Sequence, residues 1–310
     1  MFGSRWDSIL VDNLATTTGV RVICVDRPGM GGSTPVPSFI RIAVWLETVP
    51  ALLKALNVKH VSLASHSAGT IYALNTIYHL RDILDPQRPY LAMVAPYVHH
   101  SHSQAMLMKV VSKIPVSVMG AWAPLAKFVS TRITPTASWS GGIVSSTATL
   151  FQGQPGTSET GKLTFGEKYG VSEEIGKCID KLHDKWMFAE SNSAGNDEAL
   201  LCIKKPGTEW GVCDDYEEYV LLLVEREKQR LSARDDSAKL KIDVFFAESD
   251  LMIGTGGQRY FVQCWKQDGV VDTIDFRSRV LPGTDHDTAV MDLGIGAMKT
   301  VFEHIRGPAQ

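Results

Sequence analysis

The chain has 310 residues, of which 44% are hydrophobic and 21% charged, and its net charge is -3 at neutral pH. This length is enough for one large domain or for a core domain with an insertion, and the composition excludes a disordered chain. No run of basic residues marks a nucleic-acid surface, and no apolar run reaches the roughly 18 residues of a membrane span. We therefore expect a globular protein with no nucleic-acid partner and no stable membrane insertion.

The cysteines and the N-terminus indicate a cellular compartment. The five cysteines have no C-x-x-C spacing and are odd in number, which favours reduced structural thiols. The alternative is a disulfide between Cys202 and Cys213 in a secreted protein, and the sequence leaves it open. Residues 1–8 contain no apolar core of a secretory signal. These features predict a cytoplasmic protein without a metal site, and they leave its oligomeric state open.

Helical patterns and short apolar runs alternate through the first hundred residues. The apolar runs are rich in β-branched residues and end at turn signals, which is typical of strands buried on both faces of a parallel sheet. The expected order is helix 6–17, strand 20–25, helix 40–57, strand 60–65, helix 68–80 and strand 89–98.

The same alternation returns near the C-terminus, after a long segment of different character. Residues 101–237 are rich in Ser, Thr and Gly around 136–160 and end in a charged amphipathic helix over 215–234. A segment this long is no simple connection in a compact domain. We expect residues 1–100 and 238–310 to form a doubly wound, mostly parallel α/β sheet, with 101–237 inserted as a mostly helical lid. The expected C-terminal elements are strand 240–247, helix 255–267, strand 273–280 and helix 288–304.

A serine stands between the second predicted strand and the helix that follows it. In the run Ser65-His66-Ser67-Ala68-Gly69, the residues two before and two after Ser67 are small. A nucleophile on a tight strand-to-helix turn needs small residues there, because these two positions approach each other. Taken alone, the run also fits a serine that caps the following helix.

A glycine-rich turn upstream of this serine adds to the pattern. Residues 26–33 read DRPGMGGS and lack the Gly-Lys-Ser/Thr ending of a phosphate-binding loop. They resemble the D-x-P-G-x-G-x-S segment that follows the fourth strand of α/β-hydrolase-fold proteins. With the serine motif after it, the chain resembles the serine hydrolases of this superfamily. The resemblance implies the α/β-hydrolase fold, with Ser67 as nucleophile and the N–H of Ala68 as one oxyanion donor.

In this family the acid and the histidine follow the serine, in that order along the chain. Asp250 comes directly after the penultimate predicted strand, where the family carries its acid, and Glu248 is the local alternative. After the last predicted strand, residues 281–287 (LPGTDHD) resemble the family's P-G-x-G-H loop, with Asp285 in place of the common Gly. The resemblance implies that His286 is the general base. The alternative is a histidine on a surface loop.

The first residues also resemble part of a family loop. Met1-Phe2-Gly3-Ser4 is similar to the tail of the His-Gly-x-x-Gly-Ser loop, which supplies the second oxyanion N–H, and this alignment puts Met1 at the donor position. In the family, three strands precede the first helix, whereas here the first helix is predicted near residue 6. We therefore expect a fold that lacks its first strands, in a truncated or mis-started chain.

The resemblance implies a carboxylesterase-like serine hydrolase. It would cleave an ester or related acyl bond of a small apolar substrate through an acyl-enzyme, with the triad Ser67–His286–Asp250 and no cofactor. A serine nucleophile disfavours the haloalkane dehalogenases and epoxide hydrolases of this fold, whose nucleophile is Asp. The alternative is a non-catalytic, truncated pseudo-hydrolase or small-molecule binding protein of the same fold. Several apolar lid residues suit an apolar substrate, or simply a lid core: Met106, Met108, Met119, Trp122 and Phe128.

Overall fold

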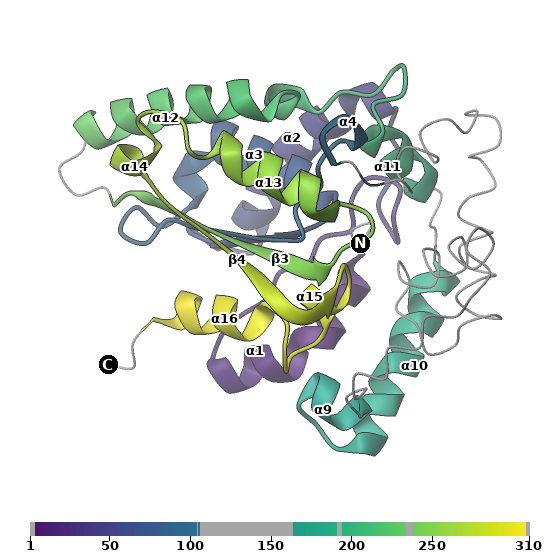
Figure 1. Cartoon of the computed structure of the whole chain (residues 1–310). Helices are drawn as coiled ribbons and strands as arrows, with labels where there is room; N and C mark the ends of the chain where they lie inside the picture. Colours follow the sequence, from purple (N-terminus) through teal and green to yellow (C-terminus); the bar gives the residue numbers. More distant parts are fainter. Residues whose placement is uncertain (1–3, 104, 106–163, 191–193, 234–237, 308–310) are drawn as a thin grey trace.

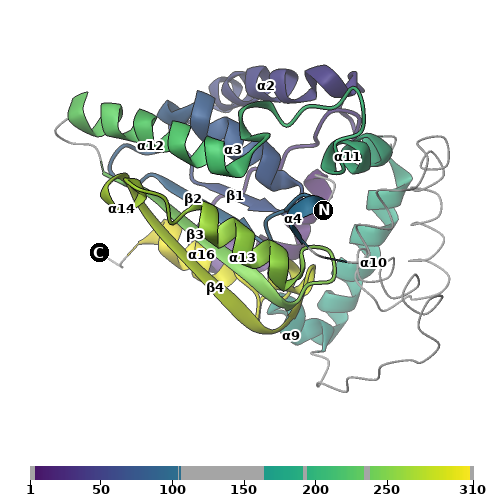
Figure 2. The ribbon, with the colours of Figure 1, turned by 45° about the horizontal axis from the view of Figure 1, so that its top comes forward.

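The sheet is parallel, and its strands lie side by side in their order along the chain. The computed structural model describes residues 4–103, 105, 164–190, 194–233 and 238–307. Because all four strands point the same way, the residues that follow them meet at one edge of the sheet. Figure 2 shows the four strands in succession: β1 (Leu63–His66), β2 (Tyr90–Val94), β3 (Leu240–Ser249) and β4 (Ile274–Asp285).

Side chains of the inner strands alternate between two hydrophobic cores. On β3, Ile242 and Val244 belong to the larger core on one face, whereas Phe245 and Ala247 belong to the core on the other face. Every residue of β2 is buried. Burial on both faces explains why these strands are continuous apolar runs in the sequence, not alternating ones.

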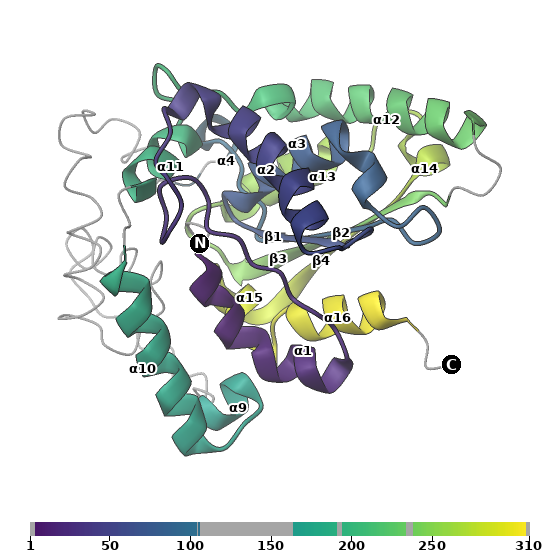
Figure 3. The ribbon, with the colours of Figure 1, turned by 180° about the vertical axis from the view of Figure 1, so that it is seen from behind.

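Helices cover both faces of the sheet, so the predicted doubly wound α/β architecture is confirmed. The larger core lies under α2 (Arg41–Ala55), α3 (Gly69–His79), α12 (Tyr216–Ala233) and α13 (Gly254–Cys264). The smaller core lies under α1 (Asp12–Thr18), α15 (Thr288–Met291) and α16 (Met298–Arg306). Figure 1 shows the helices of the larger core on one side of the strands, and Figure 3 shows α1 beside α16 on the other side.

The remaining elements of the described chain are short, apart from one long helix in the predicted insertion. None of the described helices is long and apolar enough to cross a membrane. The 3-10 helices are η1 (Arg5–Val11), η2 (Ser38–Ile40), η3 (Arg81–Ile83) and η5 (Gly211–Cys213). The other α-helices are α4 (His100–Ser103), α9 (Phe165–Tyr169), α10 (Glu173–Ala189), α11 (Ala194–Cys202) and α14 (Val270–Thr273).

The helix at the end of the predicted insertion packs on the sheet domain. One face of α12 contributes Tyr219, Val220 and Leu223 to the larger core, and the Tyr219 hydroxyl donates to the carbonyl of Leu74 in α3 at 2.9 Å. The division of the chain into a core and a lid at residues 101 and 237 stays a prediction. The five apolar lid residues expected to suit an apolar substrate, from Met106 to Phe128, lie outside the described residues.

The prediction of a buried strand over residues 20–25 was wrong. These residues have no strand assignment and make no ladder with β1, and Val22 is 37% exposed. A β-branched apolar run becomes a strand only where a neighbouring strand satisfies its N–H and C=O groups. In the described chain the sheet begins at β1 and has no such neighbour for this run. The expected absence of the first strands stays a prediction.

The closing helix predicted over 288–304 is two helices, α15 and α16. Between them, the Asp292 carboxylate accepts hydrogen bonds from the N–H groups of Gly294 and Ile295, at 2.8 and 3.1 Å. A Cβ atom at Gly296 would lie 2.8 Å from the carbonyl oxygen of Thr288, so the chain turns where only glycine fits. The helical spacing of the apolar residues carries no information about this interruption.

Candidate active site

Ser67 occupies a strained turn between β1 and α3. Its φ angle is +51°, a left-handed value that is uncommon for a residue with a side chain and costs about 1–3 kcal/mol. Two hydrogen bonds hold the turn: the Ser67 N–H donates to the carbonyl of Val94 at 3.1 Å, and the Thr70 N–H donates to the Ser67 carbonyl at 2.9 Å. A Cβ at Gly69 would lie 3.4 Å from the Cβ of Ser65, so the two flanking positions do approach each other. The turn has the features expected of a nucleophile elbow.

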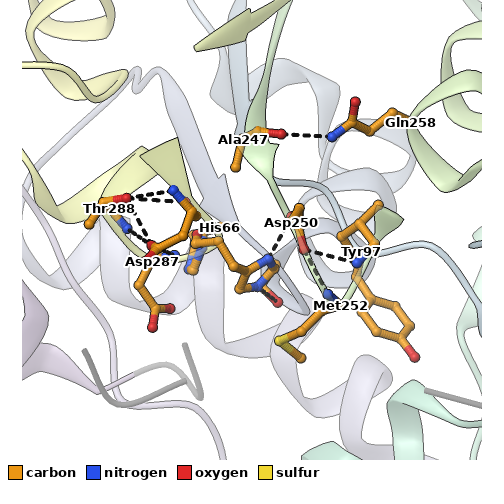
Figure 4. A network of polar contacts seen from close by, with 12 residues as sticks. His66, Tyr97, Ala247, Asp250, Met252, Gln258, Asp287 and Thr288 are labelled. Carbon is orange, nitrogen blue, oxygen red and sulfur yellow. Dashed lines mark hydrogen bonds and ion pairs between the residues drawn. The ribbon is translucent and has the colours of Figure 1, made fainter. Parts of the chain in front are cut away.

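Asp250 follows β3 directly, and its two carboxylate oxygens have different partners. Oδ1 accepts hydrogen bonds from the N–H groups of Met252 and Ile253, both at 2.9 Å. Oδ2 is left for the histidine. The Gln258 amide donates to the carbonyl of Ala247 at 2.8 Å, which ties α13 to the end of β3 (Figure 4). The carboxylate is therefore fixed by the main chain on one side.

His286 follows β4 and joins the serine to the aspartate. Its Nδ1 lies 2.8 Å from Asp250 Oδ2, and its Nε2 lies 2.9 Å from Ser67 Oγ. All three side chains are buried, with 6% of each residue exposed. Asp285 and Thr288, which flank His286 in the sequence, are joined by a hydrogen bond from the Thr288 N–H to Asp285 Oδ1 at 2.8 Å. The structure thus brings Ser67, His286 and Asp250 into one continuous hydrogen-bond chain at the carboxyl edge of the sheet.

The charges of the site favour an ionised Asp250 and a basic His286. Burial alone would raise the pKa of Asp250, but His286 and the two main-chain donors outweigh it, and the pKa is lowered. Burial alone would lower the pKa of His286, but the charge and hydrogen bond of Asp250, with a further contribution from Asp287, raise it above the usual 6.5. The carboxylate is therefore ionised at neutral pH, and it stabilises the protonated imidazole.

Ala68 and Met1 are the two residues predicted as oxyanion donors. Ala68 is buried and immediately precedes α3, as its N-cap. The first N–H groups of a helix have no partner inside the helix and carry partial positive charge, which suits a developing oxyanion. Met1 lies outside the described residues.

The alternative acid, Glu248, and the histidine cluster formed by His99, His100 and His102 lie in other environments. Glu248 is exposed, and its carboxylate accepts a hydrogen bond from the Gly283 N–H at 2.8 Å. The carboxylate bonded to the imidazole of His286 is that of Asp250. In the cluster near α4, the ring of His102 stacks on Tyr260 with ring centroids 3.9 Å apart. Among the described residues, no group of three or more His, Cys, Asp or Glu side chains is arranged to hold a metal ion.

A buried ionic cluster that the sequence did not reveal connects the glycine-rich turn to α11. Glu198 accepts from Arg27 Nη1 at 2.7 Å and from Arg41 Nε at 2.9 Å, and the Tyr72 hydroxyl donates to the same carboxylate at 2.5 Å. Arg41 also donates to the carbonyl of Pro28 at 2.5 Å. These residues come from four separate segments, so no local motif could have predicted the cluster.

Hydrogen bonds made by Asp26 and Ser33, both within the glycine-rich turn, stabilise its conformation. The Asp26 carboxylate accepts from the N–H of Arg5 at 2.7 Å and from the N–H of Gly32 at 3.3 Å. The Ser33 hydroxyl donates to the carbonyl of Asp26 at 2.8 Å. Gly29 has a φ of +77°, and a Cβ there would lie 2.8 Å from the Cβ of Ala194 in α11. The residues of this motif therefore have structural roles.

A doubly wound parallel sheet with a serine, a histidine and an aspartate joined at its carboxyl edge is the architecture of the α/β-hydrolase fold. The model of the Alpha/beta hydrolase family matches residues 2–292, and the chain belongs to this family. Among curated proteins no sequence match was found.

Solved structures similar to this chain share its fold at low sequence identity. An alpha/beta hydrolase fold protein from Nakamurella multipartita is 16% identical, with 98% of this chain and 89% of that chain covered and a TM-score of 0.50. A thermophilic esterase from Thermogutta terrifontis is 13% identical, with 98% and 84% covered and a TM-score of 0.50. An epoxide hydrolase from Vigna radiata is 13% identical, with 98% and 88% covered and a TM-score of 0.50. Proteins with different named activities share this fold, so the fold alone does not select the reaction.

Proposed function

We propose that this protein is a serine hydrolase that cleaves an ester or related acyl bond of a small apolar substrate through an acyl-enzyme. The observation that carries the proposal is the hydrogen-bond chain from Ser67 Oγ through the His286 ring to Asp250 Oδ2, with distances of 2.9 and 2.8 Å. A serine hydroxyl is a weak nucleophile on its own, and an adjacent base oriented by a third group is the arrangement that activates it.

In the proposed first half-reaction, Ser67 Oγ attacks the acyl carbon while its proton passes to His286 Nε2. The N–H of Ala68, with Met1 at the position of a second donor, stabilises the negative charge that develops on the acyl oxygen. The bond to the leaving alcohol then breaks, and the alcohol takes the proton from His286 Nε2. The product of this half is the acyl chain esterified to Ser67.

In the second half-reaction, a water molecule loses a proton to His286 Nε2 and attacks the same acyl carbon. The bond to Ser67 Oγ breaks, Ser67 recovers its proton from His286, and the carboxylic acid leaves. Asp250 stays ionised throughout and stabilises the imidazolium. The steps need neither a metal nor a cofactor. A serine at the elbow supports acyl transfer over epoxide opening, because the epoxide hydrolases of this fold use an Asp nucleophile.

Hydrolysis of p-nitrophenyl esters with acetyl, butyryl and octanoyl chains tests the proposal. We expect turnover by the purified protein and a loss of about 10⁶-fold in kcat for Ser67→Ala, the scale seen when a triad serine is removed elsewhere. The exposed Ser278 on β4 is the matched control, and Ser278→Ala should keep the wild-type rate. A folded wild-type protein that hydrolyses none of the three esters would instead support a non-catalytic binding protein.

A further inference from the structure

His66, the residue before the proposed nucleophile, contacts the main chain of the proposed base. Its Nε2 lies 2.8 Å from the carbonyl oxygen of His286, and the two rings have their centroids 4.9 Å apart. The two residues are separated by 220 positions in the sequence. His286 is therefore held at three points: its carbonyl by His66, its Nε2 by Ser67 and its Nδ1 by Asp250.

The environment of His66 decides the direction of this hydrogen bond. Burial, with a smaller contribution from His286, lowers the pKa of His66 well below the usual 6.5, so the ring is neutral at physiological pH. A neutral imidazole carries one N–H, and a carbonyl oxygen can only accept. The proton of His66 therefore resides on Nε2, and His66 is the donor.

A neutral residue at this place suits the chemistry proposed for His286. The imidazole of His286 becomes positively charged in each half-reaction, and a second positive charge on the neighbouring ring would oppose it. The neutral ring of His66 instead donates one hydrogen bond to the main-chain carbonyl of His286 and adds no charge. On the other side of His286, the bonds between Asp285 and Thr288 fix the chain that follows.

We propose that His66 is a positioning residue, which as a neutral imidazole donates from Nε2 to the His286 carbonyl and keeps the base aligned between Ser67 and Asp250. The role deepens the proposed hydrolase function and rests on it. It predicts that a neutral side chain with an N–H donor of similar reach at position 66 supports turnover, and that an apolar ring of similar size does not.

Two variants of His66 separate positioning from simple packing. His66→Phe keeps a ring and removes the donor, whereas His66→Gln removes the ring and keeps a neutral N–H donor the same number of bonds from Cα. A small misalignment of a catalytic group costs up to about 10²-fold in rate. For p-nitrophenyl butyrate we therefore expect His66→Phe to lower kcat by about that factor with an unchanged KM, and His66→Gln to recover most of the loss. His60, half-buried just before β1, is the matched control, and His60→Phe should keep the wild-type kcat.

A measurement that does not depend on turnover tests the role of His66 separately from the proposed hydrolase function. In protein labelled with ¹⁵N-histidine, nuclear magnetic resonance should find the His66 ring neutral and protonated at Nε2 at neutral pH, and the His286 resonances should broaden or shift in His66→Phe. If the wild type has no turnover while these resonances behave as stated, the hydrolase proposal fails and the contact stands. A His66→Phe protein with wild-type kcat and unchanged His286 resonances overturns the positioning role. Equal losses of kcat and thermal stability in both variants overturn it as well.

Discussion

Glu198 in α11 lies 2.7 Å from the guanidinium of Arg27 in the glycine-rich turn, and both groups are buried. The carboxylate shares its other oxygen with Arg41 at 2.9 Å, so one negative charge stands between two buried positive charges. The charge of Arg27 also contributes to the lowered pKa of His66, after the larger effects of burial and His286. The cluster thus joins a late segment of the chain to the surroundings of Ser67.

Removing the Glu198 charge should destabilise the protein strongly. In Glu198→Gln, Arg27 and Arg41 lose the charge of this carboxylate, and Arg41 keeps Asp197 at 3.8 Å. Breaking a buried ion pair from one side costs about 3–5 kcal/mol. We expect the free energy of unfolding, measured by urea denaturation, to fall by about that amount. Glu174→Gln, on the exposed surface of α10, is the control and should leave unfolding unchanged. Equal midpoints for Glu198→Gln and the wild type would contradict this account of the cluster.

Asp250 and Glu248 should differ sharply in their effect on turnover. Asp250→Asn keeps an oxygen for the Met252 and Ile253 N–H groups but loses the charge that orients the imidazole, and such a change costs about 10⁴-fold in kcat in serine proteases. Glu248→Gln alters only the contact with the Gly283 N–H. We expect the first substitution to abolish most ester hydrolysis and the second to leave it near the wild-type level. The reverse order would assign the acid to Glu248.

The raised pKa of His286 determines the acid side of the pH profile. The base must be neutral, so kcat/KM should fall as the pH drops through the pKa of His286, with a midpoint above the usual 6.5. Because the charge of Asp287 contributes to raising this pKa, Asp287→Asn should move the midpoint to lower pH. Asp268→Asn, on the exposed surface before α14, should not move it. A midpoint well below 6.5 in the wild type would contradict the assignment of His286 as the base.

The raised pKa of His286 also makes the stability of the fold depend on pH, in the opposite direction to kcat/KM. A histidine whose pKa is higher in the folded than in the unfolded state stabilises the fold while it is protonated. The contribution of His286 is therefore full below pH 6.5 and is lost as the pH rises through its folded pKa. His66, whose pKa is lowered by burial, contributes in the other direction, and its stabilisation is lost as the pH falls below 6.5. Urea denaturation of His66→Gln should therefore show a weaker loss of stability below that pH than the wild type.

The sequence predicted those parts of the fold that are determined locally. The apolar runs of β2 and β3, the small residues around Ser67, and Asp250 and His286 directly after their strands all have signals within a few residues of themselves. The run over 20–25 has the same local signal, but a strand depends on a neighbour that the run does not specify. The break between α15 and α16 depends on the close approach at Gly296.

Contacts between residues far apart in the sequence could not be predicted from the sequence alone. Glu198 is 171 residues from Arg27 and 157 from Arg41, and nothing in α11 marks the glutamate as buried. The hydrogen bond from His66 to His286 is equally invisible, since only the folded chain brings the two histidines together. Pairing across such separations requires the structure or the covariation of many sequences.

The most direct test of the central claim is covalent labelling with a fluorophosphonate probe, which reacts only with an activated serine. The probe should form one adduct with the wild-type protein, peptide mapping should locate it on Ser67, and Ser67→Ala should not react. Labelling should also be lost or greatly slowed in His286→Ala, because the base activates the hydroxyl. A folded wild-type protein that never reacts, or an adduct on a different serine, would contradict the account.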